Sequence, residues 1–176
     1  MVDPIIKNNV IIALGDLVHR HPIIIEPYLT KLYDCLRDKD TNVKKTSLLV
    51  LAHLILNDAL KIREELPELV NMLFDPADDI RNYAKLFFHE LCKKDKHTIY
   101  NLLPAAISKL SRPEELGGVS KARFDEFCKA LLGYIEKDSM SAGLTEKLLS
   151  RIAAIPVKED KIFEIINSKI FLTKKC

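Results

Sequence analysis

The sequence predicts an all-α fold, a right-handed solenoid of about four stacked helix pairs followed by a terminal helix. Two observations predict it. A period of 37 residues runs through the first two-thirds of the chain, and each period holds two apolar stripes at helical spacing. One helix pair cannot bury its own apolar face, so consecutive pairs must stack on one another.

The first helix of each pair follows from the first stripe. The periods begin at Asp3, Asp40 and Ala77, 37 residues apart. Equivalent apolar or small residues then recur in all three periods: Val10, Ser47 and Ala84; Leu14, Leu51 and Phe88; Leu17, Leu54 and Leu91. These positions are three or four residues apart, so they share one helix face and are expected to be buried.

The second helix follows from a second stripe. Its equivalent positions are Leu29, Leu66 and Leu103; Leu32, Leu69 and Ala106; Leu36, Leu73 and Leu110. Pro22, Asn57-Asp58 and the segment 93–96 separate the two helices of a pair, whereas 38–40, 75–76 and 112–113 separate one pair from the next. Pro67 and Pro104 hold equivalent places, where a helix is expected to start or to bend in its first turn.

The exact period ends near residue 112. We expect regular repeats over 3–112, a polar insertion over 113–120, and an irregular repeat with a terminal helix over 121–173. Phe124, Cys128, Leu132 and Ile135 repeat the first stripe at a displacement of 44 residues. A partner helix is predicted near 144–155 and a last helix near 159–171. No composition shift marks a second domain, so residues 1–176 are predicted to form a single domain.

Composition places the chain among folded helical proteins. Apolar residues make up 48% and charged residues 30%, and no run of eighteen apolar residues occurs, so no membrane span is expected. The four cysteines are widely spaced, which favours reduced thiols. The net charge of +2 is too small to indicate a polyanion partner by itself.

The sequence offers no pattern for catalysis or for a cofactor. Gly117-Gly118 lacks the strand-to-helix context of a phosphate loop, and His53 and His89 stand apart, one in each repeat. Neighbouring acids such as Asp78 and Asp79 point about 100° apart on a helix and cannot flank one substrate. We therefore predict a protein that is not an enzyme and has no metal, cofactor or small-molecule substrate.

Basic residues supply the candidate binding sites. An acid before a base recurs with the repeat, as in Asp40 and Lys44, and predicts an ionic ladder between neighbouring repeats. The basic clusters are candidate contacts to DNA phosphates or to a partner, with a solvated charged face as the alternative: Lys44, Lys45, Lys93, Lys94, Lys96, Lys121 and Arg123. On the polar side of the second helices, which is expected to line a concave surface, the candidate partner contacts are Lys31, Arg37, Lys109 and Arg112.

The pattern of Asp, then Val or Ile, then Arg or Lys, with a small residue three positions later, resembles HEAT repeats over residues 3–111. Three segments in order, 8–17, 43–56 and 99–110, further resemble the C-terminal region of the condensin complex subunit 1 family. Residues 100–104, Tyr-Asn-Leu-Leu-Pro, favour condensin I over the related condensin II and cohesin-associated proteins. The polar insertion weakens the resemblance beyond Pro113.

The resemblance implies a fragment of a larger non-catalytic subunit that binds kleisin and SMC partners and helps to compact mitotic chromosomes. Its expected location is the nucleus and chromosomes, with the cytoplasm outside mitosis, and chromosomal DNA or histones are further implied partners. A DNA glycosylase of HEAT-like fold is one alternative, although the chain has no Trp to help grip a flipped base. The other alternative is a transport or vesicle-coat adaptor solenoid.

Overall fold

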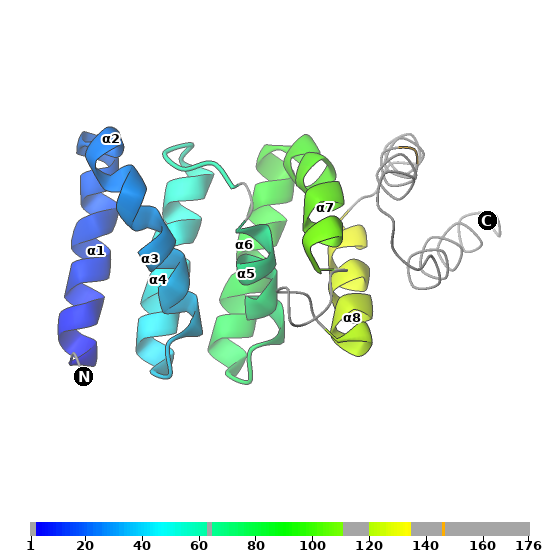
Figure 1. Cartoon of the computed structure of the whole chain (residues 1–176), viewed down its shortest axis with the longest axis horizontal. Coiled ribbons are helices and arrows are strands. Elements are labelled where there is room, and N and C mark those ends of the chain that lie inside the picture. The colour runs from blue at the N-terminus through cyan, green and yellow to red at the C-terminus, as the bar shows by residue number, and fades with distance from the viewer. Residues whose placement is uncertain (1–2, 63–64, 111–119, 135–145, 147–176) are drawn as a thin grey trace. The chain divides into compact units, whose positions relative to one another are not determined.

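The computed structural model describes residues 3–62, 65–110, 120–134 and 146, and every regular element in these ranges is helical (Figure 1). The elements are α1 (Pro4–Arg20), α2 (Pro22–Ile25), η1 (Glu26–Tyr28), α3 (Leu29–Asp34), η2 (Cys35–Arg37), α4 (Thr41–Leu56), α5 (Leu66–Asn71), η3 (Met72–Phe74), α6 (Asp78–Lys94), α7 (Lys96–Leu110) and α8 (Lys121–Leu132). The all-α class is therefore confirmed, while the handedness and the number of repeats stay predictions. The helices predicted near 144–155 and 159–171 lie outside the described residues, apart from a helical residue 146.

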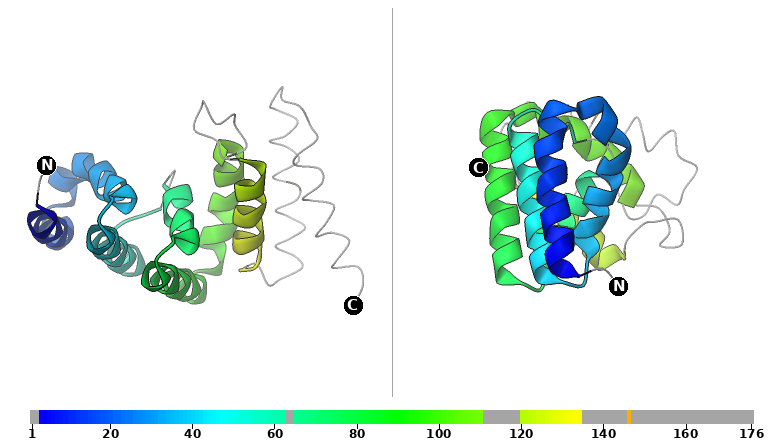
Figure 2. Two further views of the ribbon diagram at one scale, coloured as in Figure 1. Left: turned by 90° about the horizontal axis from the view of Figure 1, so that it is seen from below. Right: turned by 90° about the vertical axis from the view of Figure 1, so that its left-hand side faces the viewer.

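The chain divides into two compact units, residues 1–95 and 96–176, which are described separately. In the first unit, α1, α4 and α6 lie side by side in one layer, and the second helices form another layer against it (Figure 2). The helix α4 packs on α1, on α6 and on the preceding α3 and η2. This arrangement is the predicted stack of helix pairs within residues 3–95.

The starts of the first helices repeat with the 37-residue period. The Asp3 carboxylate accepts the N–H of Ile5 at 2.8 Å, and the Asp40 carboxylate accepts the N–H groups of Asn42 and Val43 at 2.9 and 3.1 Å. These are N-caps, which satisfy helix N–H groups that have no partner within the helix. At the third start Ala77 cannot cap, and acids occupy the first turn of α6 instead, where they favour the helix dipole.

The second helices are less regular than predicted. In the first repeat the expected helix is divided into α2, η1, α3 and η2, with Pro22 at the start of α2 and Pro27 inside η1. Pro67 lies in the first turn of α5, as predicted. Pro104 was wrongly placed by its equivalence to Pro67, because α7 begins eight residues before it and Pro104 lies inside the helix. A proline there removes one backbone donor from the helix.

The apolar stripes form the core, with one correction in the first repeat. Ser47, Leu54 and Ala84 are fully buried, whereas Val10, which is equivalent to Ser47 and Ala84, and Leu17, which is equivalent to Leu54, are exposed. The reason lies in the next repeat, where the buried Ser47 hydroxyl donates to the main-chain oxygen of Leu32 in α3 at 2.6 Å. This helix face packs on the second helix of the preceding pair, and in the described chain α1 has no such neighbour.

In the second unit, α7 packs on α8. Phe124 and Cys128 of α8 are buried, as the displaced stripe predicted, together with Phe127 and Leu131. Burial raises the pKa of the Cys128 thiol to about 12, so the thiol stays protonated at neutral pH. Within the described ranges, no helix is long and apolar enough to cross a membrane.

Candidate partner-binding surfaces

An ionic ladder links consecutive repeats in the first unit. The Lys7 ammonium donates to the Asp38 carboxylate at 2.6 Å, and Lys44, 37 residues later, donates to Asp75 at 2.5 Å. Each base belongs to a first helix and each acid to the turn that leads into the next repeat. The predicted ladder, in which an acid of one inter-repeat turn meets a base near the neighbouring turn, is therefore present. Asp40, the acid that precedes Lys44, caps α4, and Lys44 pairs with Asp75 of the next turn.

The third repeat breaks the ladder. Arg81 occupies the position of Lys7 and Lys44, but the position equivalent to Asp38 and Asp75 is Arg112, which cannot accept a hydrogen bond. Arg81 turns back instead and donates to the main-chain oxygens of Asp75 and Pro76 at 2.6 and 2.8 Å, and it also pairs with Asp78. Arg81 therefore braces the turn before α6, and Arg112 itself lies outside the described residues.

Lys45 and Lys94 also connect neighbouring repeats. Lys45 of α4 lies 3.4 Å from the Asp79 carboxylate and 5.1 Å from the centre of the Tyr83 ring, both on α6. Lys94, near the end of α6, pairs with Asp58 at 2.6 Å and donates to the main-chain oxygen of Leu56, the last residue of α4. These lysines therefore contribute to the packing of one repeat on the next.

The candidate phosphate contacts do not form one patch within residues 3–95. Lys44 and Lys45 lie near the start of α4, whereas Lys93 and Lys94 lie at the end of α6, where Lys94 contacts Leu56 at the other end of α4. Lys44 and Leu56 are separated by about 18 Å along the helix. Lys93 pairs with Glu90 at 3.0 Å, so all four ammonium groups face a carboxylate. Lys96, Lys121 and Arg123 belong to α7 and α8, and their side chains lie outside the described part. Their contacts with DNA or a partner stay predictions.

The candidate contacts on the second helices show a similar division. Lys31 of α3 is exposed, whereas Arg37 of η2 forms a two-pronged pair with Glu68 of α5, with Nε donating at 2.8 Å. The side chain of Lys109 and all of Arg112 lie outside the described residues. Both described side chains of this set are exposed, and Arg37 is held by Glu68.

The ion pairs between repeats shift the pKa values of the residues that form them. The hydrogen bond from Lys7 holds the pKa of the Asp38 carboxyl below its usual range, with a further contribution from the N–H of Asp40. The same hydrogen bond raises the pKa of Lys7. Glu68 likewise raises the pKa of Arg37. Both ladder groups at Lys7 are therefore charged at neutral pH.

A second surface lies on the side of α1, α4 and α6 that faces away from the second helices. Ile12, Leu49 and Leu86 are exposed by 48%, 41% and 57%, and they are spaced by 37 residues. They therefore hold the same position on three adjacent helices. We call these three residues the outer stripe. They lie off the two buried stripes from which the helices were predicted, and their recurrence at the repeat spacing is the sequence signal that marks them.

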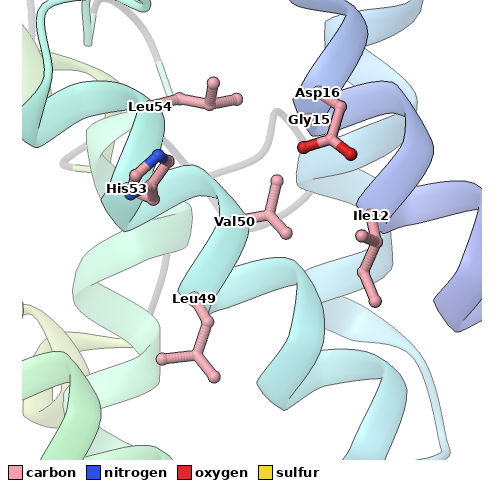
Figure 3. A pocket seen from close by; sticks show the side chains of 7 residues that line it. All are labelled: Ile12, Gly15, Asp16, Leu49, Val50, His53 and Leu54. Atoms are coloured by element: carbon pink, nitrogen blue, oxygen red, sulfur yellow. The ribbon is translucent and has the colours of Figure 1, made fainter.

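The outer stripe borders a hollow of about 200 Å³ between α1 and α4 (Figure 3). Ile12 and Leu49 stand at one end, and Asp16 and His53 stand at the other. Gly15 and Val50 form part of the lining, and a Cβ atom on Gly15 would lie 2.6 Å from Val50 Cγ1. The two helices therefore approach closely here because Gly15 has no side chain. In the next helix pair the larger, buried Phe87 takes the position of Val50.

The hollow has a mainly apolar lining with polar side chains at one end. Such a lining suits the binding of an apolar side chain. Among the described residues, no three His, Cys, Asp or Glu side chains are close enough to hold a metal ion. The candidate surfaces of residues 3–95 are thus an ion-paired basic set and an apolar outer stripe.

The comparisons with known proteins point to one family. The family model of the non-SMC mitotic condensation complex subunit 1 matches residues 5–159. Condensin complex subunit 1 of Mus musculus is 44% identical over 148 residues, which cover 84% of this chain and 10% of that protein. Condensin-1 complex subunit CAP-D2 of Arabidopsis thaliana is 37% identical over 168 residues, covering 96% of this chain and 12% of that protein.

The condensin-2 relative matches less of the chain. Condensin-2 complex subunit D3-L of Xenopus laevis is 32% identical over 95 residues, which cover 53% of this chain and 6% of that protein. The chain spans about a tenth of the length of these curated relatives. Because the family model covers most of the sequence and relatives above 30% identity match over more than four-fifths of it, the chain belongs to the condensin complex subunit 1 family.

Proposed function

We propose that this chain is part of a non-catalytic scaffold subunit of condensin I, which binds the kleisin and SMC subunits and contributes to mitotic chromosome condensation in the nucleus and on chromosomes, with a cytoplasmic pool outside mitosis. Membership of the condensin complex subunit 1 family supports the complex. The observation that supports a scaffold is the use of charge between repeats. Lys7–Asp38 and Lys44–Asp75 each join a first helix to the turn that leads into the next pair, and Arg37–Glu68 joins the second helices of two consecutive pairs.

A scaffold needs helix pairs that keep their relative positions when partners bind. Apolar stripes alone fix the distance between helices but allow sliding along them, whereas an ion pair of defined geometry also fixes their register. Each pair joins residues 31 positions apart, and Lys7–Asp38 and Lys44–Asp75 are the same contact repeated after one 37-residue period. This is the arrangement expected of a rigid support for partners.

We propose direct DNA binding only as a secondary role of this chain. A phosphate contact at Lys44, Lys45 or Lys94 requires the lysine to leave a carboxylate that already pairs with it. We therefore assign the main binding role to protein partners, with Lys31 as the first contact to test.

The test is copurification of the kleisin and SMC subunits of the same organism with the tagged chain. We expect both to be retained, and we expect Lys31→Glu to weaken retention of the kleisin. Lys39→Glu is the matched control, since Lys39 is equally exposed but lies in the turn between repeats. Failure of the wild-type chain to retain either subunit would contradict the proposed function.

A further inference from the structure

We propose that the outer stripe is a docking site for an amphipathic helix of a partner protein, whose aliphatic residue enters the hollow between α1 and α4 and whose neighbouring basic residue faces Asp16. This proposal rests on the scaffold function and adds to it a surface and a partner chemistry. It uses residues outside the buried stripes and outside the basic clusters.

The exposure of the stripe is the first argument. A single exposed aliphatic residue on a helix needs no explanation, but three at the same repeat position place apolar groups in a row across α1, α4 and α6. Another exposed position of the repeat, seven residues earlier, is not uniformly apolar and holds Ile5, Asn42 and Asp79. The stripe therefore forms a continuous apolar track over three neighbouring helices.

The hollow supplies the anchor point. Its volume of about 200 Å³ is lined by Ile12, Leu49 and Val50 on its apolar side, and the absence of a side chain at Gly15 lets the helices meet beneath it. Interfaces gain most of their affinity where one apolar side chain fills a pocket that excludes water. An aliphatic side chain of the partner is the group that fits this lining.

The spacing of the track indicates the form of the partner. Packed helix axes lie about 8–10 Å apart, so consecutive members of the stripe recur at about that distance. Residues seven apart on a helix lie on one face and are separated by about 10 Å. A partner helix that crosses α1, α4 and α6 with aliphatic residues at every seventh position would thus match all three members of the stripe.

Charge sets the orientation and the flanking residue. One helical turn beyond the stripe lie Asp16, His53 and Glu90, which again share one repeat position. Asp16 is exposed at the polar end of the hollow (Figure 3), whereas Glu90 is held by Lys93. A basic residue of the partner beside the anchoring aliphatic side chain would complement Asp16, and an acidic one would be repelled.

The probe is a labelled model peptide helix with leucines at every seventh position and an arginine flanking one of them, titrated with the chain by fluorescence anisotropy. A second peptide carries glutamate in place of that arginine. We expect the arginine peptide to bind, the glutamate peptide to bind more weakly, and Leu49→Asp to reduce binding at least tenfold, the effect of losing one anchoring contact of about 1.4 kcal/mol. Ile24→Asp, which adds the same charge at an exposed isoleucine of α2, should leave binding unchanged.

Two further variants separate docking from misfolding. Leu49→Ser removes the apolar contact without adding charge and should weaken binding with unchanged helicity by circular dichroism. Asp16→Lys should reverse the preference between the two peptides, which a merely unfolded chain could not do. Equal binding by wild type and Leu49→Asp, no preference for arginine, or no detectable binding would overturn the proposal.

Sedimentation velocity decides the identity of the occupant. If the chain forms a dimer that Leu49→Asp dissociates, the stripe binds a second copy and the proposal of a partner helix is overturned. The experiment is also distinct from the test of the proposed function. Copurification of the wild-type chain with kleisin and SMC subunits tests the scaffold, whereas only the difference between wild type and Leu49→Asp tests the outer stripe.

Discussion

The Lys44–Asp75 pair gives the sharpest test of the ladder, because it is the least exposed of the recorded ion pairs. Its side chains are 14% and 6% exposed, and its N–O distance is 2.5 Å. At an effective dielectric constant of about 20, two unit charges at that distance attract by about 7 kcal/mol, which is offset by several kcal/mol of desolvation for each ion. The pair as a whole therefore contributes little, but each charge depends on the other.

We accordingly expect Lys44→Met to lower the free energy of unfolding by about 3 kcal/mol, the lower part of the range for an unpaired buried charge. The lower part applies because Asp75 keeps the N–H of Ala77, which it accepts at 2.9 Å. Asp75→Asn should cost about 2 kcal/mol, since Asn keeps that N–H but leaves the ammonium without its carboxylate. The double variant should lose less than the sum of the two, with a coupling of about 2 kcal/mol.

Urea unfolding followed by circular dichroism measures these differences. Lys93→Met is the matched control, because the Lys93–Glu90 pair is exposed by 61% and 43% and should be worth less than about 1 kcal/mol. The reasoning is refuted if Lys44→Met costs no more than Lys93→Met, or if the double-variant cycle shows no coupling.

Four further predictions concern local geometry, pH and DNA. Asp58 has a φ of 59° at the end of α4, so Asp58→Gly should be more stable than Asp58→Ala by about 1 kcal/mol in urea unfolding; equal stability would contradict a strained backbone there. Gly15→Ala should lower the free energy of unfolding by about 1–3 kcal/mol, because the added methyl group clashes with Val50. Adding Val50→Ala to that variant should recover part of the loss. A Gly15→Ala variant more stable than wild type would show that the two helices can separate freely. The pKa of Asp38 is lowered in the folded chain, so its pair with Lys7 should stabilise the fold above about pH 4, the pKa of an unfolded aspartate. The difference in unfolding free energy between wild type and Asp38→Asn should shrink as the pH falls below that value. A difference that persists at low pH would count against the pair. Finally, since Lys44, Lys45, Lys93 and Lys94 are paired with carboxylates, anisotropy titration of duplex DNA should show only weak binding, with a Kd no tighter than about 100 μM at physiological salt. Micromolar binding that is lost at high salt would contradict this expectation.

The fold was predictable from the sequence because helical periodicity and the repeat reinforce each other. The positions of Leu51, Leu54 and Phe88 in the core follow from spacing alone, and the repeat starts at Asp3 and Asp40 lie directly before α1 and α4. The division of the first repeat's second helix was not predictable in this way. Apolar spacing continues through Leu29 and beyond, and the change to 3₁₀ turns depends on local backbone geometry that the pattern does not encode.

The candidate sites were less predictable, because periodicity assigns a residue to a face but not to a partner. In the sequence Lys44 and Lys45 look like a basic cluster. In the fold they form ion pairs with Asp75 and Asp79, which are more than thirty residues away along the chain. The outer stripe was missed for the opposite reason. Exposed aliphatic residues are common in single helices, and only the comparison of three repeats at Leu49 and its equivalents makes them a feature.

The hydrogen bond from Ser47 to Leu32 has a consequence for how the repeats find their order. Its position holds Val10 in the first repeat and Ala84 in the third, so within residues 3–95 this position carries a hydroxyl only at the junction between the first and second pairs. Similar repeats can stack on the wrong neighbour at small cost in apolar contact, but a mispaired Ser47 would be buried without an acceptor. This one hydroxyl therefore favours stacking of the second pair on the first over other pairings, in the way that a single buried asparagine fixes the alignment of a coiled coil.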